Sequence, residues 1–189
     1  MNQKVFDLYT DFLISALGPA TATGMARVLD GQVSHDQVTR LLADAAKTSA
    51  DLWRISKPLV RQIERPDGVI SIDDSLSEKL YTDENDIICW HWSHSLSRHV
   101  KGIEFLTAFY TVGEVSLPIA FDLVEKTEEY LDAKTGKTKR RSPITKNQRY
   151  RMLLRVAVHN QVQFQYVLND LWYASADNMK FIKLDLKKD

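Results

Sequence analysis

The segment GVISIDDSLSEKL, residues 68–80, decides the fold of this chain, because an apolar run in it ends in two adjacent aspartates. Val69–Ile72 is rich in β-branched residues and predicts a short strand. Side chains alternate between the two faces of a strand, so Asp74 shares a face with the two isoleucines while Asp73 lies on the other. Two interpretations stay open here: both carboxylates are solvated at a strand end, or one of them binds a metal ion.

The composition describes a folded chain that is long enough for one large domain, or for one medium domain with a small appendage. It has 189 residues, of which 44% are hydrophobic. Lys and Arg together number 25, as do Asp and Glu, so the net charge gives no overall attraction to nucleic acid or membrane. The single cysteine, Cys89, excludes an intramolecular disulfide and a cysteine-rich zinc site, and it fits a reducing cytoplasm. No apolar run approaches the roughly 18 residues that span a bilayer.

Residues 1–62 predict a small all-α domain. Apolar residues recur at helical spacing until Gly18-Pro19 ends the first helix. Two further helices, residues 21–29 and 34–46, are joined by a glycine-containing turn. This outline fits a helix-turn-helix motif that reads DNA. It also fits any helical hairpin, because basic and acidic residues are balanced in this segment and a basic face is the usual mark of DNA binding.

The rest of the chain predicts an α/β domain. Strand patterns occupy residues 69–72, 103–111 and 116–123, and the last two are separated by a turn that contains Gly113. A helix over residues 149–160 and a further strand over residues 162–168 follow.

Asp74 and Asp170 end two of these strands in the same way. Phe164, Tyr166 and Leu168 form an apolar row that finishes in Asp170, as the isoleucine row finishes in Asp74. In a sheet covered by helices both carboxylates emerge at its edge, and they meet if the two strands are neighbours. Close carboxylates repel unless a cation lies between them, so the pair predicts a site for a hard cation such as Mg²⁺ or Mn²⁺.

The basic residues gather in one segment, KTGKTKRRSPITKNQRYR, residues 134–151, which contains eight of them and no acidic residue. It is either a solvated, mobile loop or a surface that binds DNA phosphates, for which clustered Lys and Arg are the expected means. The candidate phosphate contacts are Lys139, Arg140, Arg141, Lys146 and Arg149, together with Lys101 from an earlier segment.

Three histidines, His91, His94 and His99, invite interpretation as zinc ligands. A structural zinc site needs four ligands, and Cys89 is the only cysteine nearby, so this is the weaker interpretation. The segment predicts instead a partly buried loop or strand that lies close to DNA.

Three segments resemble the DDE transposases of bacterial insertion sequences. They are DDSLSEKLYTDENDIICWHWSHSLSRHVKGIEFLTAFY, SLPIAFDLVEKTE and YVLNDLWYASADNMKFI. The resemblance implies an RNase H-like mixed sheet flanked by helices over residues 66–189, in which an Asp-Asp-Glu triad holds two ions of Mg²⁺ or Mn²⁺. Together with the strand alternation it makes Asp74 the first ligand, with Asp73 as the alternative, and Asp170 the second.

The resemblance also implies a function. Such a chain cleaves DNA at the ends of an insertion sequence and joins the freed 3′ hydroxyl to target DNA. Its partners are then the terminal repeats, the target DNA and further copies of the chain. We expect it at the nucleoid in the bacterial cytoplasm, without a membrane partner.

One feature of that family is missing from this sequence. The third ligand, a glutamate, lies well downstream of the second aspartate in the family, and no acidic residue after Asp170 fits it. We therefore expect an amino-terminal fragment of a transposase that is inactive by itself. The alternative is a DNA-binding module without catalysis, which occupies the transposon ends and inhibits the full-length enzyme.

Overall fold

The computed structural model describes residues 3–43 and 47–189. The chain divides into two compact units, Met1–Lys47 and Thr48–Asp189. The helical region that the sequence predicts over residues 1–62 therefore contributes to both units.

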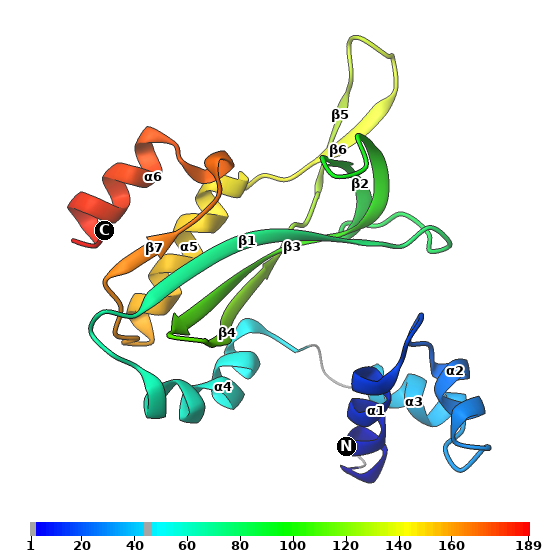
Figure 1. Ribbon diagram of the computed structural model, residues 1–189. Coiled ribbons are helices and arrows are strands. Elements are labelled where there is room, and N and C mark those ends of the chain that lie inside the picture. The colour runs from blue at the N-terminus through cyan, green and yellow to red at the C-terminus, as the bar shows by residue number, and fades with distance from the viewer. Residues whose placement is uncertain (1–2, 44–46) are drawn as a thin grey trace. The chain divides into compact units, whose positions relative to one another are not determined.

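The first unit consists of three helices, α1 (Gln3–Ser15), α2 (Ala22–Val28) and α3 (His35–Leu42) (Figure 1). Ser34 begins α3 with a capping box, in which side chain and backbone exchange two hydrogen bonds with the residue three positions on. The buried apolar side chains of this unit are Val5, Met25, Val33 and Val38. The predicted hairpin of α2 and α3 is present, although its last predicted residues, 44–46, lie outside the described part of the chain.

The second unit is built on a mixed sheet. Its strands are β1 (Val69–Glu78), β2 (Ile88–Ser93), β3 (Arg98–Val112), β4 (Val115–Leu123) and β7 (Tyr166–Leu168). β3 pairs antiparallel with β1 along one edge, and with β2 and then β4 along the other, while β7 pairs parallel with β1. Helix α5 (Lys146–His159) crosses from the antiparallel strands to β7 (Figure 1). This arrangement confirms the predicted α/β, RNase H-like class.

Helices α5 and α4 (Ser49–Ile63) both contribute to the core of this unit. Val60 of α4 and Leu154 of α5 join the same buried cluster as the isoleucines of β1. The guanidinium of Arg61 donates to the backbone carbonyl of Asn160, which ties the ends of the two helices together. Helix α4 thus belongs to the sheet domain, although the sequence pattern groups it with the helices before it.

Two stretches differ from the secondary structure that the sequence predicts. The basic segment is not simply a loop, because β6 (Thr138–Arg141) forms a hairpin with β5 (Glu128–Leu131). The predicted strand 162–168 is reduced to β7, in which Val167 packs on the core while Tyr166 and Leu168 are exposed. Of the predicted apolar row, Phe164 is buried in the core, but the prediction was wrong for Tyr166 and Leu168, because the register of β7 places Val167 opposite a buried isoleucine of β1.

Short helical turns follow β7. They are the 3-10 turn η1 (Leu171–Tyr173), helix α6 (Ala176–Lys180) and the π-helical turn η2 (Phe181–Asp185). Phe181 and Ile182 complete the core. No helix in the described ranges is long and apolar enough to cross a membrane.

Candidate functional site

Asp74 lies on the same face of β1 as the buried isoleucines, as the alternation predicts. Its side chain is half-buried, whereas that of Asp73 is exposed and accepts a hydrogen bond of 2.8 Å from the Asp74 amide. The two aspartates do not end the strand, since β1 continues to Glu78. Asp74 is therefore held in the middle of a paired strand, opposite Leu106 of β3.

The carboxylates of Asp74 and Glu104 converge on one ammonium group, that of Lys146. The Lys146 Nζ atom is 2.8 Å from Asp74 Oδ2 and 2.6 Å from Glu104 Oε1. Lys146 is the first residue of α5, and the Thr145 side chain caps the helix just before it. The sheet and the crossover helix thus meet at a bridge of one cation between two anions.

Glu104 is the residue of this site that the sequence interpretation missed. It is 6% exposed and receives a further contact from His91, whose Nδ1 is 3.0 Å from Glu104 Oε2. Burial alone would raise the pKa of Glu104, but the hydrogen bonds from His91 and Lys146 outweigh it and hold the pKa at about 2. The carboxylate is therefore ionised at neutral pH. The sequence signal for Glu104 is a glutamate at a position of a long strand where the alternation of apolar residues predicts a buried side chain.

Tyr173 contacts Asp74 from the other side. Its hydroxyl donates to Asp74 Oδ1 at 3.1 Å, and its ring stacks on Tyr150 with 5.0 Å between the ring centroids. Burial, and then the charge of Asp74, raise the pKa of Tyr173, so the hydroxyl stays protonated as a donor. The Asp74 carboxylate is thus held by partners at both of its oxygens.

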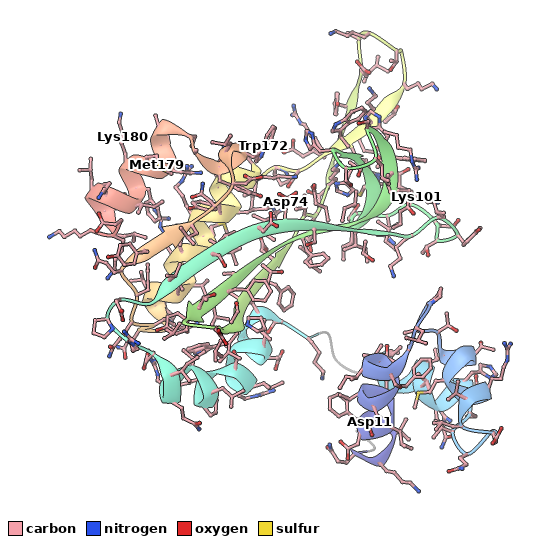
Figure 2. All side chains as sticks on the ribbon, viewed as in Figure 1. Asp11, Asp74, Lys101, Trp172, Met179 and Lys180 are labelled. Carbon is pink, nitrogen blue, oxygen red and sulfur yellow. The ribbon has the colours of Figure 1, made fainter. Side chains whose placement is uncertain are left out.

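Asp170 follows β7 and lies at the same cleft. Its carboxylate accepts a hydrogen bond of 2.8 Å from the Trp172 amide and caps the 3-10 turn, and the side chain remains exposed. The cleft has a volume of about 380 Å³ and is lined by Asp73, Asp74 and Asp170 together with Glu104, Lys146 and Trp172. Figure 2 labels Asp74 and Trp172, which approach it from β1 and from the segment after β7. Adjacent parallel strands therefore bring the two predicted aspartates to one cleft.

The cleft fits a hard cation by the kind of its ligands, because carboxylate oxygens are what Mg²⁺ and Mn²⁺ prefer. Lys146 already compensates Asp74 and Glu104, however. In the part of the chain that the structure describes, no three His, Cys, Asp or Glu side chains come together closely enough to hold an ion. A divalent ion bound between Asp74 and Glu104 would take the place of the ammonium group.

The three histidines of the zinc interpretation have other partners. His91 is buried against Glu104, whereas His94 and His99 contact the Trp92 ring edge to face. The described residues form no zinc site from them.

Three basic residues of the β5–β6 hairpin are paired with acidic ones. Lys139 pairs with Asp132, Arg140 with Asp86 and Glu129, and Arg141 with Glu128. Exposed pairs of this kind contribute little to stability, so the basic groups can exchange their partners for phosphates at small cost.

Arg149 lies elsewhere, and it is only 5% exposed. Its guanidinium donates to Asp122 at 2.6 Å and to the backbone carbonyl of Leu123 at 2.8 Å. A DNA phosphate cannot reach it without breaking these contacts, so the structure assigns Arg149 to packing between α5 and β4. Lys101 remains half-exposed on β3, opposite Trp90 of β2.

One protein family matches nearly the whole chain. Residues 2–183 match the model of a family described as DDE superfamily endonuclease, and the matched range includes every residue of the cleft. Searches of curated proteins and of solved structures gave no match. Endonucleases of this superfamily act on DNA and generally use divalent metal ions. From its matched length and its RNase H-like sheet, the chain belongs to the DDE superfamily of endonucleases.

Proposed function

We propose that this chain is of the transposase type, which cleaves DNA at insertion-sequence ends and transfers the freed strand, that Asp74 and Asp170 are its metal ligands, and that it is inactive by itself. The observation that carries the proposal is the position of these carboxylates at one cleft, on or directly after adjacent parallel strands. In a complete enzyme of this type, two ions of Mg²⁺ or Mn²⁺ would activate a water or hydroxyl and stabilise the leaving oxygen.

The neighbours of Asp74 favour it over Asp73 as the first ligand. Tyr173 and Lys146 each hold one oxygen of the Asp74 carboxylate, and Glu104 in turn anchors Lys146. Asp73 has only the backbone amide of the next residue as a recorded partner among the described residues. The Tyr173 hydroxyl keeps the Asp74 carboxylate in one orientation before a ligand arrives, which lowers the cost of binding, whereas an ion between Asp74 and Glu104 would take the place of the Lys146 ammonium.

DNA contacts are proposed for the hairpin residues Lys139, Arg140 and Arg141 and for Lys101. The helical hairpin of the first unit is proposed as a second DNA-binding element, which would recognise the terminal repeats. The chain would act as several copies on DNA, at the nucleoid in the bacterial cytoplasm.

Cleavage of DNA that carries the sequence flanking the gene for this chain tests the proposal. Because no glutamate after Asp170 fits the third ligand of the family, we expect little or no nicking by the chain itself in Mg²⁺ or Mn²⁺, and any nicking that occurs should be lost in Asp74→Asn and in Asp170→Asn. The matched control is Asp67→Asn, since Asp67 is an exposed aspartate just before β1 that pairs with Arg65. Nicking that persists in both cleft variants would refute the assignment of the metal ligands.

A second candidate function is a DNA-binding module that occupies the transposon ends without cleaving them and thereby inhibits a complete enzyme. The Lys146 ammonium favours it, because it already neutralises two carboxylates of the cleft. Salt-sensitive binding to the flanking DNA, with no nicking in either metal, would select this function over the enzyme.

A further inference from the structure

Two tryptophans project from the outer face of β2. Trp90 and Trp92 are 52% and 48% exposed, whereas the residues between and beside them, Cys89 and His91, are buried. Large aromatic side chains are costly to leave in water, and these two lie two positions apart on one strand face. The buried face of β2 does not explain them, because it is the opposite face; on their own face the Trp92 ring contacts His94 and His99.

The tryptophans begin a row of rings that reaches the aspartate cleft. The Trp92 ring is 6.4 Å from His94 between centroids, and His94 is 5.9 Å from Trp172. Trp172 lines the cleft together with Asp74. We call Trp90, Trp92, His94 and Trp172 the aromatic row.

A second cavity lies at the outer end of this row, between β2 and the β5–β6 hairpin. Its volume is about 620 Å³. The residues of its lining that matter here are Trp90, Trp92, Tyr130, Lys126, Lys137 and Arg140. Trp92 lines both this cavity and the aspartate cleft, so the aromatic row joins the two.

The charges at the outer end of the row are mainly positive. Within the described residues Lys137 has no ion-pair partner, and Lys101 lies directly across from Trp90 on the neighbouring strand. The Lys126 ammonium donates to the backbone carbonyl of Trp90 at 2.6 Å. Glu84 is the one acidic residue that lines this cavity among the described residues. Aromatic faces flanked by basic side chains are the combination that binds unpaired nucleic acid, since every base offers a face for stacking and every phosphate a negative charge.

We propose that the aromatic row binds an unpaired DNA strand, whose bases stack on Trp90 and Trp92 and whose phosphates face Lys137 and Lys101. The strand then passes Trp92 and enters the cleft at Trp172, beside Asp74 and Asp170. This inference rests on the proposed function and deepens it, because it names a single strand rather than a closed duplex as the form that reaches the carboxylates. In a duplex the bases are already stacked on one another and cannot offer their faces to the tryptophans.

Fluorescence polarisation with a labelled thymine oligonucleotide, in EDTA and at fixed salt, tests the inference on the full chain. We expect the single strand to bind more tightly than a duplex of equal length. Trp92→Ala should weaken single-strand binding by about 5- to 150-fold, the range that corresponds to loss of one stacked base. Trp92→Phe, which retains a ring, should recover most of the affinity.

The matched control is Tyr166→Ala, which removes a half-exposed ring from β7, outside both cavities. Circular dichroism confirms that each variant is folded. If duplex binds as well as the single strand, or if Trp92→Ala and Tyr166→Ala behave alike, the inference is overturned while the proposed function stands. If neither form of DNA binds at any salt concentration, both are overturned.

Discussion

The Lys146 ammonium donates a hydrogen bond of 2.8 Å to the carboxylate of Asp74, across the junction of α5 and β1. It also contacts Glu104, so one positive charge serves two negative ones. Burial lowers the pKa of Lys146, but its bonds to Asp74 and then to Glu104 outweigh burial and raise the pKa above its ordinary value. The cleft is therefore occupied by a fixed internal cation at neutral pH.

We predict that the Lys146 ammonium competes with a metal ion for the carboxylates of Asp74 and Glu104. In Lys146→Met the two carboxylates lose their shared partner, and we expect the free energy of unfolding to fall by about 1–3 kcal/mol in metal-free buffer. Mn²⁺ should then raise the melting temperature of the variant more than that of the original chain, because a ligand that binds only the folded state stabilises it. Differential scanning fluorimetry with and without Mn²⁺ measures both effects.

The control is Lys183→Met, which removes a lysine that pairs with Asp189 on the exposed surface. Mn²⁺ should affect this control and the original chain equally. An equal effect on Lys146→Met as well would mean that the ammonium does not compete with metal.

The lowered pKa of Glu104 predicts sensitivity to acid. A carboxyl whose pKa is lower in the folded than in the unfolded state stabilises the fold above the unfolded value. For Glu104 that contribution is lost as the pH falls from the ordinary value of 4.5 to about 2. The loss amounts to about 3 kcal/mol.

The variant Glu104→Gln keeps the shape of the side chain and removes its titration. We expect it to be less stable at pH 7 and to lose less stability than the original chain between pH 4.5 and 2, as measured by urea unfolding. Glu128→Gln, at an exposed ion pair of the hairpin, is the control and should follow the original chain. Parallel curves for all three proteins would contradict the role of Glu104.

The sequence predicted the face of β1 on which Asp74 lies, but it did not predict the contact of Lys146 with Glu104. The difference has a physical reason. Alternation placed Asp74 correctly because β1 has a buried face along its first four residues, which leaves a clear pattern. The contact of Lys146 with Glu104 depends on how α5 packs against β3, and no local pattern records that. At β7 the prediction from alternation failed, because a strand of three residues is too short to give a regular pattern of buried and exposed side chains. The RNase H-like arrangement of the strands was predictable from the family resemblance. A resemblance of this kind predicts the topology of a sheet better than individual side-chain contacts.

The position of α4 predicts where the sheet domain begins. A fragment of residues 48–189 should unfold cooperatively, because it keeps Val60 in the core and the hydrogen bond of 3.1 Å from the Phe121 amide to Ser49 Oγ. A fragment of residues 66–189, which begins where the sequence pattern changes, should lose several kcal/mol of stability or fail to fold, since it exposes the core that α4 covers. Thermal melts followed by circular dichroism compare the two, and equal stability would place α4 outside the domain.

Arg149 and Lys137 lie in the same basic segment, and we expect their replacement to separate stability from DNA binding. Arg149→Met should lower the free energy of unfolding by about 3 kcal/mol, because it leaves the carboxylate of Asp122 without its partner. Lys137→Ala should leave stability unchanged. It should reduce the slope of log affinity against log salt concentration by about one, as expected for loss of one phosphate contact. Urea unfolding and salt titrations of DNA binding distinguish the two residues. If Lys137→Ala binds DNA with an unchanged salt dependence, the phosphate path lies away from the β5–β6 hairpin.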